Sequence, residues 1–143
     1  MSHGTSATIA AMKTRLLFFS ILCLLFTTQA ASAQDATSDL LIRINNLRAS
    51  LGLYVYSYNG ALAAAAQSQA QWIAETGNVS HTRPDGSTPR DRALSAGYST
   101  TAVSENIYAG TMATVDSAWN FWINSSIHYA GLTSTYYSEI GIG

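Results

Sequence analysis

Three ionisable side chains, placed at nearly even spacing in the second half of the chain, constrain its fold more than any other feature. His81 precedes Glu105 by 24 residues, and His128 follows Glu105 by 23. Each lies in a different predicted structural element, so no single helix turn or strand can bring the three together. They can meet only in a folded site. Because only 10% of the residues are charged, these three are a large share of the available chemistry.

The N-terminus has the pattern of a secretory signal peptide. Lys13 and Arg15 precede the apolar run 16–26, and the small residues 31–33 precede Gln34. This apolar run is too short for a membrane-spanning helix, although an uncleaved N-terminal anchor is the alternative. We therefore expect a secreted, extracellular protein with residues 1–33 removed and no transmembrane anchor.

Composition narrows the classes of partner. Cys23, the only cysteine, lies in the signal sequence, so the mature domain of residues 34–143 must be stabilised by packing alone. Its 110 residues suffice for one domain. This domain has five basic and eight acidic residues, so its formal charge is −3. No basic patch remains, which argues against nucleic-acid binding and against adhesion to anionic lipid surfaces.

Four segments have the apolar spacing or the helix-forming composition of helices, and each begins after a candidate capping residue. Thr37 or Ser38, Asn59, Thr88 and Thr114 are the candidate caps, and Gly52, Gly77 and Gly97 are the candidate stops of the first three helices. The apolar face of the first helix covers residues 40–51, and the next two helices span 61–76 and 89–96. The alanine run 63–66 in the second helix predicts close packing of that helix against a sheet.

Two segments are predicted strands, 102–109 with Glu105 and 136–142 at the end of the chain. Residues 53–58 are predicted to be an extended link, in which Tyr54, Tyr56 and Tyr58 alternate as in half-buried packing. Helices interspersed with strands predict an α+β or α/β layered fold.

In this order and spacing, the motifs resemble those of the secreted CAP domain, which occurs in cysteine-rich secretory proteins, antigen 5 proteins and plant pathogenesis-related proteins. The resemblance is greatest to the cysteine-free bacterial branch, the SCP-like extracellular proteins. It covers residues 38–143. The segments that carry it are Ser80-His81, Gly97-Tyr98, Ser104-Glu105-Asn106-Ile107-Tyr108-Ala109-Gly110, Trp122 with Ser125 and His128, and Glu139-Ile140-Gly141-Ile142-Gly143.

The resemblance implies a three-layer α-β-α sandwich with a small antiparallel sheet. It also implies a cleft lined by two histidines and two glutamates, matched here by His81, Glu105 and His128. Ser104 replaces the glycine of the family's Gly-Glu-Asn motif, and Ser125 stands where the second glutamate is expected. The family domain continues beyond the segment that ends this chain, so we expect one or more last strands to be missing and the sheet edge to be open.

Three interpretations of the three residues remain open, and one of them is general acid–base catalysis by the same side chains. His81, His128 and Glu105 carry the donor atoms that zinc and copper prefer, which predicts a divalent-metal site, with zinc as the candidate cofactor. Alternatively, the three side chains form a hydrogen-bonded polar cluster that closes the core. The sequence has no activated nucleophile, because it lacks a mature cysteine and a Gly-x-Ser-x-Gly motif.

Three functions are therefore considered. The resemblance implies a non-enzymatic module that binds a small apolar ligand, such as a fatty or sterol-like lipid, or an extracellular partner. The second is a metal-dependent hydrolase acting on peptide or cell-wall material. The third is a structural surface module. Metal stoichiometry separates the first two from the third, and loss of hydrolysis on changing Glu105 would favour the second.

Overall fold

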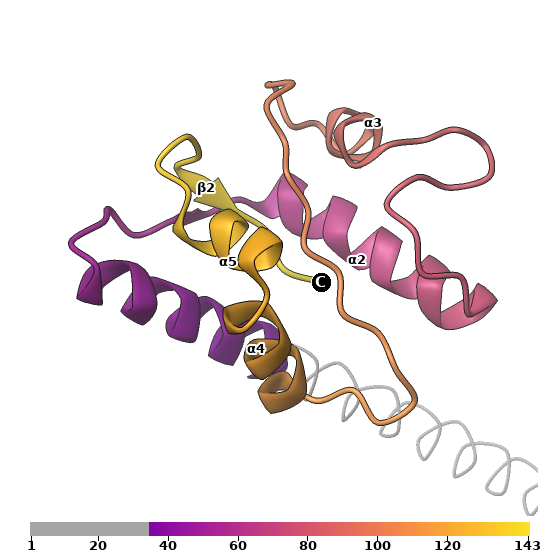
Figure 1. Ribbon diagram of the computed structural model, residues 1–143. Helices are drawn as coiled ribbons and strands as arrows, with labels where there is room; N and C mark the ends of the chain where they lie inside the picture. The colour runs from indigo at the N-terminus through magenta and orange to yellow at the C-terminus, as the bar shows by residue number, and fades with distance from the viewer. Residues whose placement is uncertain (1–34) are drawn as a thin grey trace, which may run out of the picture. The chain divides into compact units, whose positions relative to one another are not determined.

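A computed structural model of the chain describes residues 35–143 (Figure 1). The predicted signal peptide, residues 1–33, lies outside the described residues. The chain divides into two compact units, Met1–Ala36 and Thr37–Gly143, and the fold below is that of the second. Within the described part, no helix combines the length and the apolar character needed to cross a membrane.

Five helical segments and two short strands make up this unit, so the mixed α+β class predicted from the sequence is confirmed. They are the helix of residues 35–50, β1 (Ser57–Tyr58), α2 (Gly60–Thr76), α3 (Pro89–Ser95), α4 (Val115–Ile123), α5 (Ser126–Thr133) and β2 (Glu139–Ile140). Helix α2 packs against α3, and α4 packs against α5.

Local side-chain chemistry sets both ends of α2, as predicted. The side chain of Asn59 accepts hydrogen bonds from the backbone N–H groups of Ala61 and Leu62, two donors that the first turn leaves unpaired. Gly77 ends the helix in the left-handed conformation, with φ 68°, and its N–H donates to the carbonyl of Ile73.

Helices α3 and α4 begin with the same type of N-terminal capping motif. Thr88 at the start of α3 and Thr114 at the start of α4 each accept a hydrogen bond from the backbone three residues on, and the side chain at that position bonds back. This reciprocal arrangement is a capping box. The returning side chain is Asp91 in α3 but Ser117 in α4. The predicted starts of both helices are therefore confirmed.

Other helix predictions need correction. The first helix already includes residue 35, so neither Thr37 nor Ser38 is its cap, although Gly52, with φ 71°, follows its end as predicted. Helix α5 was not predicted. It begins almost at once after α4, and the side chain of Ser125 at its N-cap makes no capping hydrogen bond, so the usual start signal is missing.

The sheet is parallel, and the predicted antiparallel arrangement is wrong. In the register, Ser57 lies opposite Glu139 and Tyr58 opposite Ile140. The N–H of Ser57 donates to the carbonyl of Ser138 at 2.9 Å. Helices α2, α3, α4 and α5 all lie between the two strands in the sequence. So long a connection can return the chain in the same direction, whereas an antiparallel pair suits a short hairpin.

The predicted strand over residues 102–109 is not a strand. No residue of that segment enters a ladder, and the two-stranded sheet of the described chain consists of β1 and β2. Side chains from neighbouring elements hold the segment instead, among them the guanidinium of Arg92 and the indole of Trp122. In the predicted strand 136–142, only Glu139–Ile140 forms a ladder.

The last residues of the chain alternate between two surroundings. Ile140 and Ile142 pack on the core cluster. Gly141 and Gly143 lie against α2 so closely that a Cβ on Gly141 would come within 2.0 Å of the backbone N of Ala63. Only glycine permits this backbone approach. The alanine run of α2 thus packs closely against the segment that follows β2, and not against the strand itself.

The core is formed by the first helix, the link after it, α4, α5 and the C-terminal segment (Figure 1). Its buried residues are Ile44, Tyr56 and Leu132, with Leu47, Trp119, Trp122, Ile123, Tyr137, Ile140 and Ile142 packed around them. The expected half-burial of the three alternating tyrosines is wrong. Tyr56 is buried beneath the guanidinium of Arg48, whereas Tyr54 and Tyr58 are exposed.

Candidate functional site

Two of the three predicted site residues, His81 and Glu105, are in contact. Nδ1 of His81 lies 2.9 Å from Oε1 of Glu105, and the two side chains are 55% and 16% exposed, respectively. An ionised carboxylate only accepts hydrogen bonds, so the imidazole must donate through Nδ1. In the neutral ring this leaves Nε2 as a bare acceptor, and the ring is exposed enough for a ligand to reach it.

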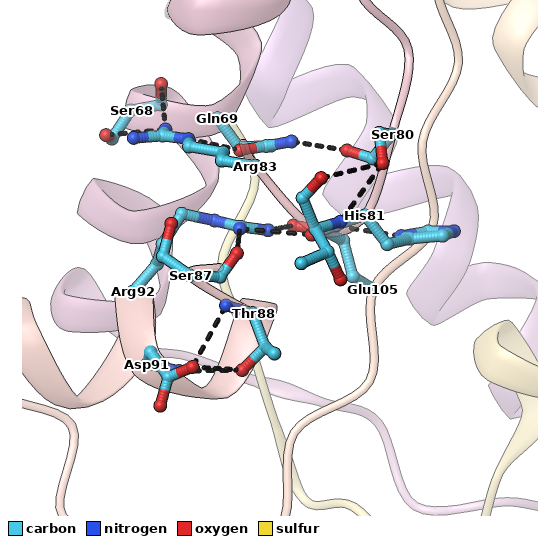
Figure 2. Close-up of polar contacts among 11 residues, drawn as sticks. Ser68, Gln69, Ser80, His81, Arg83, Ser87, Thr88, Asp91, Arg92 and Glu105 are labelled. Carbon is cyan, nitrogen blue, oxygen red and sulfur yellow. Dashed lines mark hydrogen bonds and ion pairs between the residues drawn. The ribbon is translucent and has the colours of Figure 1, made fainter. Parts of the chain in front are cut away.

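A buried arginine holds this pair in place (Figure 2). Arg92, on α3, donates from Nη2 to Oε2 of Glu105 at 2.8 Å and from Nη1 to the carbonyls of His81 and Ser87, each at 3.1 Å. Its side chain is only 5% exposed. Glu105 therefore has one oxygen on the imidazole and the other on the guanidinium. Arg92 fixes both the carboxylate and the backbone of His81.

Helix α2 fixes the loop that carries His81 from the other side (Figure 2). The buried side chain of Gln69 donates to the carbonyl of Ser80 at 2.7 Å. Arg83 donates from Nε to Oε1 of Gln69 at 2.9 Å and from Nη2 to the carbonyl of Ser68 at 2.8 Å. The residues on both sides of His81 are thus tied to one helix.

The position of α3 depends on an ionisable cap. The hydroxyl and the backbone N–H of Thr88 both donate to the carboxylate of Asp91, at 2.6 and 3.0 Å. These hydrogen bonds hold the pKa of Asp91 below its usual range. The helix that carries Arg92 therefore begins with a contact that favours the ionised form of Asp91.

His128 has a different environment. Its Nδ1 lies 2.7 Å from the hydroxyl of Ser125, and its carbonyl accepts a hydrogen bond from Nδ2 of Asn106 at 2.9 Å. The imidazole packs on the ring of Phe121, with centroids 4.9 Å apart, and Phe121 packs on Tyr108 at 5.4 Å. We call Tyr108, Phe121 and His128 the aromatic cluster.

Four consecutive residues, 105–108, connect the two histidines, and we call them the bridging segment. Each one contacts a side chain or carbonyl from outside the segment. Their partners in chain order are His81 with Arg92, the carbonyl of His128, the indole N–H of Trp122 and the ring of Phe121. An extended chain advances at most about 3.6 Å per residue, so the Cα atoms of Glu105 and Tyr108 lie within about 11 Å. The bridging segment therefore links the His81–Glu105 pair to the aromatic cluster through three peptide units.

The predicted site residues thus form two pairs, His81 with Glu105 and Ser125 with His128. Within residues 35–143 there is no group of three His, Cys, Asp or Glu side chains placed to hold a metal ion. Both oxygens of Glu105 are already engaged, one of them by a cation. With its oxygens so engaged, Glu105 is not free to ligate a metal ion directly, and a divalent-metal site on His81 and His128 stays a prediction.

Sequence reasoning missed Arg92 and Gln69. Arg90 and Arg92 stand two positions apart in the same short helix, and nothing local distinguishes them. Arg90 is exposed and Arg92 is buried. The exposure of each depends on which face of α3 meets α2 and the bridging segment. The spacing from Glu105 carries no signal of that contact.

Comparisons with known proteins support the resemblance. The chain matches the model of the cysteine-rich secretory protein family, CAP, over residues 41–143. A similar solved structure is an outer surface protein from Borrelia burgdorferi, which is 26% identical, with a TM-score of 0.68. That alignment covers 76% of this chain and 80% of the other. No curated protein sequence gives a significant match.

The family match spans α2, the His81 loop, α3, the bridging segment, α4 and α5. These are the elements that assemble the two histidine pairs. The chain belongs to the CAP family.

Proposed function

We propose that this chain is a secreted, extracellular CAP module that binds a small amphiphilic ligand of lipid or sterol type without transforming it. The observation that carries the proposal is the bridging segment. It carries both Glu105, which contacts the imidazole of His81, and Tyr108 of the aromatic cluster, and the Cα atoms of these two residues lie within about 11 Å. A polar head and an apolar body of one small molecule can span such a distance.

Exposed apolar side chains around the aromatic cluster favour an apolar ligand. Phe121 is 46% exposed although it packs on both Tyr108 and His128. Ile127 and Met112, which flank the cluster in the sequence, are 77% and 87% exposed. Aromatic rings offer a large apolar contact area with little loss of conformational entropy on binding.

The arrangement of the polar groups favours binding over covalent catalysis. A serine nucleophile needs one imidazole that contacts the hydroxyl and is oriented by a carboxylate. Here the carboxylate of Glu105 contacts His81, whereas the hydroxyl of Ser125 contacts His128. The carboxylate and the hydroxyl that such a triad needs thus contact two different histidines.

The test is a titration with a sterol and with a long-chain alcohol, followed by tryptophan fluorescence. Trp122 is a suitable reporter, because its indole N–H donates to the carbonyl of Ile107 in the bridging segment. We expect saturable binding that Phe121→Ala weakens. Leu51→Ala is the matched control, since Leu51 is 48% exposed and lies outside the cluster. Equal loss in both variants would contradict the proposed surface.

The same preparation separates the alternatives. If the protein hydrolyses peptide or cell-wall material and Glu105→Gln abolishes this activity, the protein is a hydrolase and the proposal is wrong. Zinc-dependent stabilisation that is lost in the His81→Ala, His128→Ala double variant would restore the metal site. Binding of neither ligand, with no turnover, would leave an extracellular partner protein or a structural role.

A further inference from the structure

We propose that Arg92 is a positioning residue that fixes His81 as a hydrogen-bond acceptor, so that the polar group recognised there is a donor such as a hydroxyl, not a carboxylate. The part concerning the ligand rests on the proposed function. The part concerning Arg92 and His81 stands on contacts within the chain.

The first step concerns the carboxylate. Glu105 is largely buried, and each of its oxygens has its own partner at 2.8 or 2.9 Å. A buried carboxylate stays ionised and oriented only when it is paired and hydrogen-bonded. The guanidinium of Arg92 supplies the opposite charge on the side away from the imidazole. Glu105 is therefore held as a pure acceptor, which forces Nδ1 of His81 to be the donor.

The second step concerns the loop. The same guanidinium also donates to the carbonyl of His81 and to that of Ser87. One side chain thus fixes both the backbone of His81 and the partner of its ring. Free histidine favours the other tautomer, with the proton on Nε2, so the tautomer expected here depends on the Arg92–Glu105 contact.

The third step concerns the ligand. Nε2 of His81 has no hydrogen-bond partner among residues 35–143, and the ring is more than half exposed. In the neutral imidazole this nitrogen can only accept a hydrogen bond. A hydroxyl donates to it, whereas a carboxylate has no proton to donate and brings a negative charge towards Glu105. A long-chain alcohol is therefore preferred over the matching fatty acid.

The test begins with the unliganded wild-type protein at about pH 8, above the range in which free histidine titrates. Nitrogen-15 chemical shifts of the two imidazoles report which ring nitrogen carries the proton. We expect His81 to be protonated on Nδ1, whereas a proton on Nε2 would overturn the proposal. This measurement needs no variant, so it decides the matter even if substitutions at Arg92 do not fold.

Variants then test the role of Arg92. We expect Arg92→Gln to move the proton of His81 towards Nε2, and Arg92→Lys, which keeps the charge, to restore part of the wild-type spectrum. Arg90→Gln is the matched control, because Arg90 is exposed on the same helix. The signals of His128 are an internal control. A His81 tautomer unchanged in a folded Arg92→Gln protein would show that Arg92 has only a structural role.

Ligand selectivity is measured last, with dodecanol and dodecanoate below their aggregation limits. We expect the alcohol to bind better, and Arg92→Gln to weaken alcohol binding about two- to tenfold, the value of one hydrogen bond. Better binding of the acid would overturn the ligand assignment. If neither binds while His81 has the expected tautomer, the proposed function fails but the positioning role stands.

Discussion

The two histidines of this domain are the same residue type, but they are held by different chemistry. A carboxylate contacts His81, and it is itself held by a buried guanidinium. A serine hydroxyl and an aromatic ring contact His128. A carboxylate can only accept a hydrogen bond, whereas a hydroxyl can donate or accept. The partner of His81 therefore dictates which ring nitrogen is offered to a ligand, and the partner of His128 does not.

The helices next to the two histidines also differ in whether their capping residues are ionisable. Helix α3, behind His81, starts with an ionisable capping box, Thr88 with Asp91, whereas α4, next to His128, starts with Thr114 and Ser117. The side chains that hold His81 are thus charged, whereas those that hold His128 are neutral. The ion pair of α4, Asp116 with Arg43, joins that helix to the first helix and includes neither histidine. The regions should respond differently to loss of charge and to acid, but alike to damage of the shared core.

The largest effect should come from the core. In Gly141→Ala, the new Cβ would lie 2.0 Å from the backbone N of Ala63. Because backbone cannot move aside cheaply, we expect a loss of about 3 kcal/mol or more in the free energy of unfolding, measured by urea denaturation. Gly110→Ala is the control, since its Cβ would meet nothing within 4 Å. A wild-type midpoint for Gly141→Ala would contradict the close packing of the segment after β2 on α2.

The next effect separates the two regions. Arg92→Met leaves Glu105 without its charged partner, and breaking a buried ion pair from one side costs about 3–5 kcal/mol. Because Glu105 is partly exposed, we expect the lower end of that range. Amide exchange should increase in the His81 loop and in α3 but remain slow in α5. Equal loosening of both regions would contradict the comparison.

A smaller effect should be confined to His128. Ser125→Ala removes the hydroxyl that lies 2.7 Å from Nδ1 of the ring. We expect a loss of about 1 kcal/mol, the usual value of a neutral hydrogen bond. Ring signals of His128 should shift, and those of His81 should not. Ser126→Ala is the control, because Ser126 is the exposed neighbour of Ser125. A shift of the His81 signals in Ser125→Ala would show that the two regions are coupled through the bridging segment.

The smallest effect is a difference in acid response. The pKa of Asp91 is lowered in the folded state, first by its hydrogen bond from the Thr88 hydroxyl. Its contribution to stability is therefore fully present above the unfolded value of about 3.9 and is lost as the pH falls through the lower, folded value. Below about pH 4, amide exchange should accelerate in α3 before α4. Asp91→Asn should abolish that difference between α3 and α4. If the difference persists in this variant, the capping carboxylate is not its cause.

The sequence predicted most helix boundaries, because a cap acts over three or four residues. Asn59, Thr88 and Thr114 begin their helices, and Gly77 ends α2, where local hydrogen bonding places them. The sheet was not predictable in this way. Its two-residue ladder joins Ser57 to Glu139 across most of the domain. Hydrophobic alternation cannot tell the direction of so short a pairing.

For the site, the motifs predicted that His81, Glu105 and His128 come together, whereas the structure brings His81 to Glu105 and gives His128 the hydroxyl of Ser125. The motifs did not distinguish a metal site from a hydrogen-bonded one. Arg92 favours the hydrogen-bonded interpretation, because it engages one oxygen of Glu105. It reaches Glu105 only because α3 folds back towards the bridging segment. Such a contact between a buried cation and a carboxylate leaves no local pattern. The pairing of Ser125 with His128 spans only one helical turn, and the sequence had marked both residues.

The central claim is that the bridging segment joins both histidines into one ligand-binding surface. Chemical-shift mapping of the labelled protein during titration with a sterol or a long-chain alcohol tests it most directly. The account predicts that His81, Tyr108, Phe121 and His128 shift together, with one common dissociation constant. Shifts confined to one histidine, or located away from residues 105–108, would contradict it.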